Sequence, residues 1–214
     1  MAMVAAVAGR ARRTQAERSA STRARLLDAA IDCLHDLGYA GTSTPEIARR
    51  AGLSRGAQLH HFPTKTELVV GAVQHLFDRR REEFLRAFAA RPQGSDPIEV
   101  AIDILWSMVS GPTFKVWLEL AVAARTDPEL GEPVAELTER LAALIEQTFR
   151  ELFPPPAGPT PFFAVAPRFA FALLDGLALE RINARDPRAH EPVLAALKGL
   201  ARLVMPRPGA DPTA

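Results

Sequence analysis

Residues 43–68 read STPEIARRAGLSRGAQLHHFPTKTEL, and this stretch carries the start and stop signals of consecutive short helices. A hydroxyl side chain followed three residues later by a glutamate is typical of an N-terminal capping box. Ser43 with Glu46 fits this pattern, although Thr44 could also cap the same helix. Gly52 is suited to end it, because glycine tolerates the backbone that follows a helix C-terminus. The pattern predicts a first short helix of about two turns.

A second short helix is expected immediately after the glycine turn. Ser54 offers a new cap, the helix covers about Arg55–Phe62, and Pro63 ends it. A further capping box then begins a longer helix over about residues 64–90. The stretch therefore predicts helix, turn, helix and a long helix leaving the unit.

This order is the arrangement that a helix-turn-helix needs. The first helix braces the second, and the second presents its outer face to the DNA major groove, which is about 12 Å wide. That face must be polar and must not be acidic. The residues expected on it include no Asp or Glu: Ser54, Arg55, Gly56, Ala57, Gln58, His60 and His61.

The preceding segment, TRARLLDAAIDCLHDLGYAGTS at residues 22–43, predicts one more helix. Leu27, Ile31 and Leu34 recur at helical spacing, and Gly38 is expected to end the helix. Cys33 lies within it and is interpreted as a small packing residue, since a single cysteine forms no internal disulfide.

Residues 21–70 as a whole resemble the DNA-binding segment of the TetR family of transcriptional repressors. The resemblance rests on the two quoted stretches, including the Gly-aromatic turn after the first helix. It implies a homodimer that binds a palindromic operator in double-stranded DNA. It also implies a small-molecule effector that binds the C-terminal domain and weakens DNA binding.

The resemblance assigns roles to individual residues. Ser43 and Thr44 match positions that hold a DNA phosphate, which a hydroxyl at a helix N-terminus suits. Lys65 matches a lysine that touches the phosphate backbone, and His61 stands where the family commonly has a phosphate-contacting tyrosine. The positions that match groove-facing residues are Arg55, Ala57, Gln58 and His60.

The chain departs from the family pattern inside the second short helix. The family often has Leu-Tyr-His-Tyr-Phe where this chain has Gln58-Leu59-His60-His61-Phe62. Gln58 is expected on the exposed face, where it could pair with adenine through two hydrogen bonds. Leu59 is expected to pack inward. Gly56 either allows close approach to the DNA backbone or is a packing feature.

Charge is distributed unevenly along the chain. Residues 1–65 hold ten Lys or Arg and five Asp or Glu, whereas the remainder holds 16 basic and 20 acidic residues. A basic N-terminal third favours a polyanionic partner for that part alone. Residues 1–20 are interpreted as a disordered leader or as a basic arm on nucleic acid. Arg79–Arg81 is interpreted as a solvated face, with phosphate contact as the alternative.

The rest of the chain also reads as helical, with Pro and Gly breaks and no sustained strand alternation. The expected helices cover about residues 97–110, 113–125, 130–152, 162–185 and 190–204. The fold class is therefore all-α with about nine helices. The predicted organisation is a basic tail, a helix-turn-helix domain, a ligand-binding and dimerisation domain, and a C-terminal tail: residues 1–20, 21–81, 82–206 and 207–214.

The resemblance further implies that the middle helices surround an effector cavity. Asp175 interrupts an apolar run and could anchor a ligand, although an ion pair or a surface position is the alternative. Each apolar candidate could equally be plain core. The candidate effector-binding residues are Trp106, Met108, Phe114, Trp117, Phe171 and Asp175. By the same analogy the last two helices form a four-helix dimer interface that buries Leu173, Leu177, Leu194, Leu197 and Leu200 or their neighbours.

Other function classes find little support in the sequence. No phosphate-binding loop, dinucleotide fingerprint, nucleophile elbow or zinc-protease motif is present, so no catalytic residue, metal site or cofactor is predicted. The apolar runs are broken by charge before about 18 residues, and the initial apolar stretch precedes the arginines, so a cytoplasmic protein without membrane contact is expected. A helical protein–protein adaptor without a DNA role is the alternative.

Overall fold

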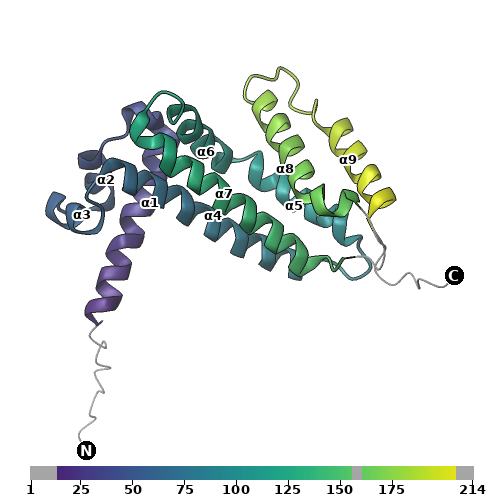
Figure 1. The fold of residues 1–214 in the computed structure, drawn as a ribbon, viewed down its shortest axis with the longest axis horizontal. Coiled ribbons are helices and arrows are strands. Elements are labelled where there is room, and N and C mark those ends of the chain that lie inside the picture. Colours follow the sequence, from purple (N-terminus) through teal and green to yellow (C-terminus); the bar gives the residue numbers. More distant parts are fainter. Residues whose placement is uncertain (1–13, 156–160, 206–214) are drawn as a thin grey trace, which may run out of the picture.

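The computed structural model describes residues 14–155 and 161–205, and within these ranges all regular structure is helical, as predicted. Helices α4 (Lys65–Ala89) and α7 (Pro128–Leu152) run side by side along the molecule (Figure 1). The short helices α2 (Thr44–Ala51) and α3 (Arg55–His61) lie at one end, where α1 (Gln15–Gly41) projects away from the other helices. The helices of the described residues are α1 (Gln15–Gly41), α2 (Thr44–Ala51), α3 (Arg55–His61), α4 (Lys65–Ala89), α5 (Pro97–Val109), α6 (Pro112–Ala123), α7 (Pro128–Leu152), α8 (Pro161–Arg181) and α9 (Glu191–Val204).

Helix α1 begins earlier than the sequence pattern indicated. Thr14 Oγ1 accepts a hydrogen bond from Glu17 N, and the Glu17 carboxylate accepts one from Thr14 N, which completes a capping box. Assigning residues 15–20 to the tail was therefore wrong: they form exposed helix, started by this cap and not by apolar contacts. The remaining expected tails, residues 1–13 and 207–214, lie outside the described residues.

The helix-turn-helix part has its own core. Leu26 and Leu27 of α1, Ile47 of α2 and Leu68 of α4 pack together with Phe62, which follows α3. Cys33 is fully buried in the same core, which confirms it as a packing residue. Together these contacts fix the short helices α2 and α3 against the two long ones.

A second core joins the helix-turn-helix part to the rest of the molecule. It is built from α1, α4, α6 and α7, with Val69 and Val73 of α4 against Leu120 of α6 and Leu137 of α7. Helix α4 therefore contributes side chains to both cores within its first three turns. A shift of α4 at one end has to be accommodated at the other.

A third core lies between α5, α8 and α9 and overturns part of the expected dimer interface. Leu177, Leu194 and Leu197 are buried here against Ile102 and Trp106 of the same chain, so they cannot face a partner. The family analogy implies that these helices meet a partner, but it does not identify which face of each helix does so. Intramolecular packing of α8 on α9 and α5 decides which face is covered.

The arginine run on α4 contacts its own chain. Arg79 pairs with Asp28 of α1 at 2.8 Å. Arg80 and Arg81 donate to Thr113 of α6 and Thr148 of α7, at 2.7 and 2.8 Å. These contacts hold α4 against its neighbours, and the run is not a purely solvated face.

Candidate nucleic-acid interface and effector cavity

The turn between α2 and α3 is fixed by a glycine and an arginine. Gly52 has φ 61°, a left-handed conformation that favours glycine, and a Cβ there would lie 3.0 Å from the Arg25 guanidinium. That guanidinium donates to the carbonyls of Ala51 and Gly52, at 2.5 and 3.3 Å, and so caps the end of α2. Ser54 then caps α3 by accepting a hydrogen bond from Ala57 N at 3.1 Å.

Helix α3 presents a small face without carboxylates. Its exposed side chains are those of Arg55, Leu59 and His60, and Gly56 is exposed beside them. A Cβ added at Gly56 would meet only Ser54 Oγ, at 3.9 Å. His61 is half-buried, as is Ala57. The open space around Gly56 shows that packing within the chain does not require glycine there.

Two expectations on α3 are wrong. Gln58 is 0% exposed, and its side-chain amide donates to the Phe62 carbonyl at 2.6 Å, so it is unavailable to read a base. Leu59 is 45% exposed and does not pack inward. The polar side chain of Gln58 is thus buried and the apolar side chain of Leu59 is exposed, which is the reverse of what their polarity suggests. The side-chain oxygen of Gln58, Oε1, has no hydrogen-bond partner among the described residues.

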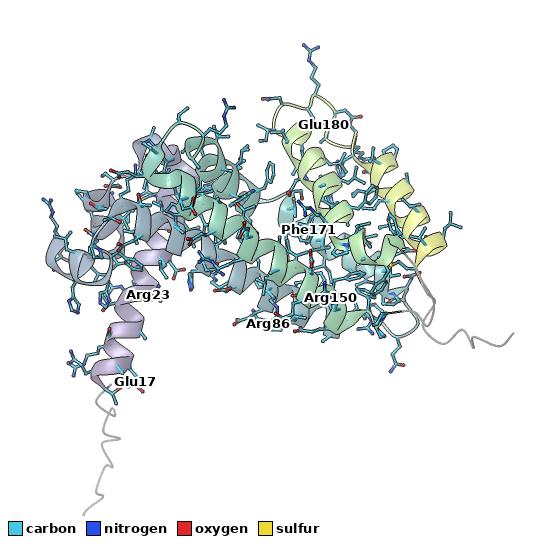
Figure 2. The ribbon with its side chains drawn as sticks, viewed as in Figure 1. Glu17, Arg23, Arg86, Arg150, Phe171 and Glu180 are labelled. Atoms are coloured by element: carbon cyan, nitrogen blue, oxygen red, sulfur yellow. The ribbon has the colours of Figure 1, made fainter. Side chains whose placement is uncertain are left out.

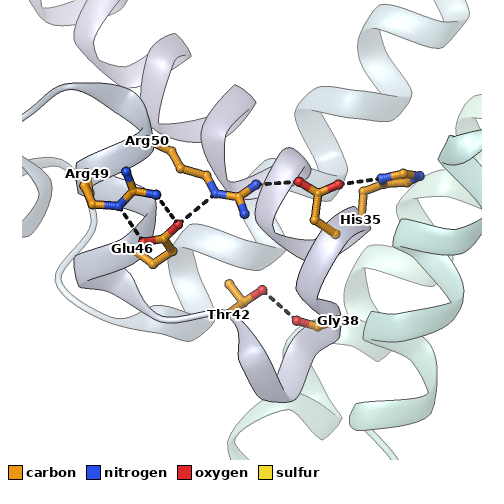
Figure 3. Close-up of polar contacts among 7 residues, drawn as sticks. His35, Gly38, Thr42, Glu46, Arg49 and Arg50 are labelled. Atoms are coloured by element: carbon orange, nitrogen blue, oxygen red, sulfur yellow. Dashed lines mark hydrogen bonds and ion pairs between the residues drawn. The ribbon is translucent and has the colours of Figure 1, made fainter.

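Helix α2 offers its N-terminus at the same end of the molecule. Ser43, and not Thr44, is its cap, and Ser43 Oγ accepts from Glu46 N at 3.4 Å. The Glu46 carboxylate turns instead to Arg49 and Arg50, at 2.7 and 2.9 Å (Figure 3). Hydrogen bonds from these two guanidiniums lower the pKa of Glu46 to about 2. The carboxylate is thus already neutralised within its own helix.

Arg50 extends this network to α1. It also pairs with Asp36 at 2.7 Å, and Asp36 contacts His35 at 3.0 Å (Figure 3). Hydrogen bonds from His35 and Arg50 lower the pKa of Asp36. The network therefore ties α2 to α1 by charge as well as by apolar contact.

Lys65 lies at the start of α4 and faces α1. Its Nζ donates to the Tyr39 carbonyl at 2.9 Å and lies 3.8 Å from the centroid of the Tyr39 ring. Burial lowers the pKa of this half-buried lysine. The ammonium therefore holds the turn after Gly38 in place, and a phosphate contact by Lys65 stays a prediction.

Tyr39 connects this end of the molecule to the larger domain. Its backbone N–H donates to Glu119 of α6 at 3.1 Å, and its hydroxyl donates to Asp127, just before α7, at 3.0 Å. Burial, followed by the Asp127 contact, raises the pKa of Tyr39 to about 12. Gly38 is left-handed with φ 66°, and a Cβ there would lie 2.7 Å from Glu119 Oε2. The Gly-aromatic pair was visible in the sequence, but its partners were not.

A cavity of about 410 Å³ lies between α4, α5, α6, α7, α8 and α9. Figure 2 marks Phe171 at this part of the molecule, far from Arg23 in the helix-turn-helix part. Five of the expected effector-binding residues line the cavity: Met108, Phe114, Trp117, Phe171 and Asp175. Sequence reasoning missed aromatic residues that line it from α4 and α7, because their helical spacing looks like ordinary core: Phe77, Phe84 and Phe149.

Trp106 does not line the cavity, so the expectation for it is wrong. Its ring packs against His190 at a centroid distance of 4.6 Å, with the ring planes tilted by 33°, and the Arg181 guanidinium lies 6.0 Å from the centroid of the Trp106 ring. The indole belongs to the core between α5, α8 and α9. Helix α5 turns this side chain away from the cavity and Met108 toward it.

Comparisons with known proteins agree with this architecture. A family model described as "Bacterial regulatory proteins, tetR family" matches residues 26–72, and one described as "BetI-type transcriptional repressor, C-terminal" matches residues 107–205. An uncharacterized HTH-type transcriptional regulator of Mycobacterium tuberculosis is 34% identical over 188 residues, covering 86% of this chain and 96% of that protein.

Two further similarities concern named proteins. The HTH-type transcriptional regulator CymR of Pseudomonas putida is 37% identical over 135 residues, covering 63% of this chain and 66% of CymR. The crystal structure of the multidrug binding protein EbrR complexed with ethidium superposes with a TM-score of 0.58 at 26% identity, covering 86% of this chain and 99% of that one. The two family models match the helix-turn-helix part and the C-terminal part, and the mycobacterial relative covers most of the chain. The chain therefore belongs to the TetR family of bacterial regulatory proteins.

Proposed function

We propose that this protein is a sequence-specific transcriptional repressor that binds its operator as a homodimer and releases it when a small molecule fills the cavity. One observation carries the proposal: α4 joins the core beneath α3 to the wall of the cavity. Leu68 belongs to that core, while Phe77 and Phe84 line the cavity. A ligand that favours one position of α4 therefore favours one position of the DNA-binding helices.

The surface at the α3 end supports DNA as the partner. Arg55 and His60 project from a helix that has no carboxylate, and the N-terminus of α2 is available to a phosphate near Ser43 and Thr44. Arg18 on the exposed first turns of α1 adds positive charge. These are the contacts expected of a protein that positions itself by phosphates and reads bases with one helix.

Helix α6 supplies a second route from cavity to DNA. Trp117 lines the cavity, and Glu119, two residues later, accepts from the Tyr39 backbone. Tyr39 in turn holds Lys65 at the start of α4. A ligand that moves α6 has to move or break the Glu119–Tyr39 contact, which gives two arrangements with different operator affinity.

A dimer is supported by an apolar stripe on α8. Val165, Phe169, Ala172, Gly176 and Leu179 are exposed and recur at alternating spacings of four and three residues. This spacing marks one face of a helix that packs on another helix. A Cβ at Gly176 would meet nothing within 4 Å, which leaves room for a second backbone. A dimer that binds a palindromic operator has to hold its two recognition helices in successive major grooves, about 34–36 Å apart.

The same helix is long and apolar enough to cross a membrane. The segment Phe162–Arg181 reaches a mean hydropathy of 1.6 over an 18-residue window, of which 28% is buried within the protomer. Either a helix of a partner subunit or membrane lipid could cover such a face. Membership of the TetR family favours the partner subunit. The mass in detergent-free solution distinguishes the two, because an uncovered face of this kind would cause aggregation.

The proposal is tested by fluorescence anisotropy on the DNA upstream of the protein's own gene, with a scrambled duplex as control and at two salt concentrations. Tight binding to the native fragment alone, by a species of twice 23.2 kDa, is the expected result. Leu179→Glu should yield monomers that bind weakly, whereas Val122→Glu, an equally exposed position on α6, should not. A folded dimer that binds neither duplex would contradict the proposal and favour the adaptor role.

A further inference from the structure

The cavity contains several charged side chains, and most have partners within the chain. Arg80 pairs with Glu83 at 2.5 Å and also contacts Thr113. Arg81 pairs with Glu151 at 2.6 Å and also contacts Thr148. The guanidiniums of Arg80 and Arg81 are therefore neutralised by carboxylates of α4 and α7.

The remaining charges differ in their surroundings. Glu146 of α7 pairs with Arg150 at 3.1 Å, and Arg168 of α8 is exposed to solvent. Asp175 lines the cavity one turn after Phe171, is half-buried, and has neither an ion-pair nor a hydrogen-bond partner within residues 14–155 and 161–205. Burial raises its pKa to about 6. It is the one half-buried carboxylate of the described cavity wall without a cation.

Such a carboxylate is unfavourable unless something compensates its charge. Removing an ionised group from water is costly, and a cation with hydrogen-bond donors offsets that cost. The rest of the wall is dominated by apolar side chains. Aromatic rings come from four helices around the cavity, and their faces attract positive charge: Phe77 and Phe84 on α4, Phe114 and Trp117 on α6, Phe149 on α7 and Phe171 on α8.

We infer that the effector is an organic cation, an amine or quaternary ammonium on an apolar body of drug-like size, and that its charged group binds Asp175. This inference rests on the proposed role of the cavity as an effector site. An anion is disfavoured in the same place, because Arg80 and Arg81 are already paired, Arg168 is exposed to solvent, and Asp175 repels negative charge. The aromatic wall packs against the apolar body and contributes cation–π attraction.

The test uses three probes with one body and different heads: 4-butylbenzylamine, 4-butylbenzyl alcohol and 4-butylbenzoate. Isothermal titration calorimetry on the full-length protein at pH 7.5 measures each affinity. The amine should bind about tenfold tighter than the alcohol, as a charge-assisted contact implies, and the benzoate should bind weakest. An amine no tighter than the alcohol, a preference for the benzoate, or no binding of any probe would each overturn the inference.

Three variants assign the preference to Asp175. Asp175→Asn should lower amine affinity about tenfold and leave the alcohol unchanged, because only the charge is removed. Asp175→Glu should keep the preference. Glu146→Gln, a paired carboxylate of the same wall, should also keep it. Equal preferences in wild type and Asp175→Asn, with both proteins folded by circular dichroism, would show that the carboxylate does not bind the amine.

A pH series adds an independent readout. Asp175 loses its charge as pH falls through about 6, while the amine stays protonated. The amine-to-alcohol ratio should therefore decrease between pH 7.5 and 5 in wild type and stay flat in Asp175→Asn. A flat ratio in wild type would contradict the inference.

Operator binding is measured on the same samples, which separates this inference from the proposed function. Asp175→Asn should bind the operator as wild type does, but the amine should release it less effectively. If the amine preference holds while the operator is never released, the binding chemistry stands and the repressor mechanism fails. If other compounds release the operator and the amine preference is absent, the repressor mechanism stands and the inference about the amine fails.

Discussion

The ammonium of Lys65 and the carbonyl of Tyr39 are joined by a 2.9 Å hydrogen bond across 26 residues of sequence. The contact ties the first turn of α4 to the turn that ends α1. Because Tyr39 is also held by Glu119 and Asp127, the start of α4 is linked to α6 and to the beginning of α7 through one tyrosine. This link gives Lys65 a structural role that its expected phosphate contact does not include.

Replacing Lys65 by Met tests both roles. Loss of one net hydrogen bond of about 1 kcal/mol should lower the melting temperature by about 2–4 °C. If Lys65 also contacts a phosphate, operator and scrambled DNA should lose affinity by the same factor, and the salt slope should decrease by about one. Lys115→Met, at an exposed position on α6, is the control. A melting temperature equal to wild type would contradict the structural role.

Gln58→Leu should leave the sequence preference unchanged and raise stability. The buried amide keeps an oxygen without a partner, and such a group costs about 1–3 kcal/mol. Leucine has a similar volume and no polar atom, although it gives up the contact to Phe62 O. Thermal unfolding and anisotropy on single-base operator variants measure the two effects. Relaxed specificity at one base would revive a reading role for Gln58.

Leu59→Ala, in contrast, should leave stability almost unchanged and alter the sequence preference. Its side chain is exposed, so stability should change by no more than about 0.5 kcal/mol. An exposed leucine on a recognition helix suits the methyl group of thymine, and each specific contact is worth about 1–3 kcal/mol. Replacing operator thymines one at a time by deoxyuridine removes only that methyl. At the contacted position, wild type should lose affinity and Leu59→Ala should not; equal losses at every position would contradict the contact.

Two glycine-to-alanine changes should separate stability from DNA affinity. Gly56→Ala should stabilise the fold by about 1 kcal/mol, because the site is helical and open, but weaken DNA binding if the backbone approaches DNA closely. Gly38→Ala should destabilise by about 1–3 kcal/mol, since the left-handed backbone and Glu119 both oppose a Cβ. Melting curves and anisotropy of the pair provide the comparison. Unchanged DNA affinity in Gly56→Ala would show that the close approach is absent.

Acid sensitivity should report on the Glu46 network. The folded pKa of about 2 lies below the ordinary value of 4.5, so the contribution is complete above about pH 4.5 and is lost as pH falls toward 2. Glu46→Gln should therefore show a smaller decrease in melting temperature over this interval than wild type. Glu139→Gln, an exposed position on α7, should follow the wild-type curve. Parallel curves for Glu46→Gln and wild type would contradict the linkage.

The sequence predicted the helices well because caps, glycines and prolines act locally. It failed at Gln58 and Leu59 because α3 has only two turns, too few for a hydrophobic pattern to define the inner face. Residue polarity then suggested the wrong orientation, and contacts with α1 and α4 decided the right one.

Long-range contacts explain the other failures. Tyr39 meets Glu119 and Asp127 across 80 and 88 residues, and no local signal records such a contact. Aromatic residues around the cavity follow the same helical spacing as core residues, so spacing alone could not separate Met108, which lines it, from Trp106, which does not. The cavity is a property of how six helices are placed, not of any one of them.

Helix α4 contributes side chains both to the DNA-binding core and to the cavity. Substitutions in the cavity are therefore more constrained on α4 than on α7 and α8. A change at Phe77 or Phe84 alters the helix on which operator recognition depends. A change at Phe149 on α7 or Phe171 on α8 alters ligand fit without touching the core beneath α3. New effector specificities, whether natural or engineered for biosensors, should therefore arise first on α7 and α8.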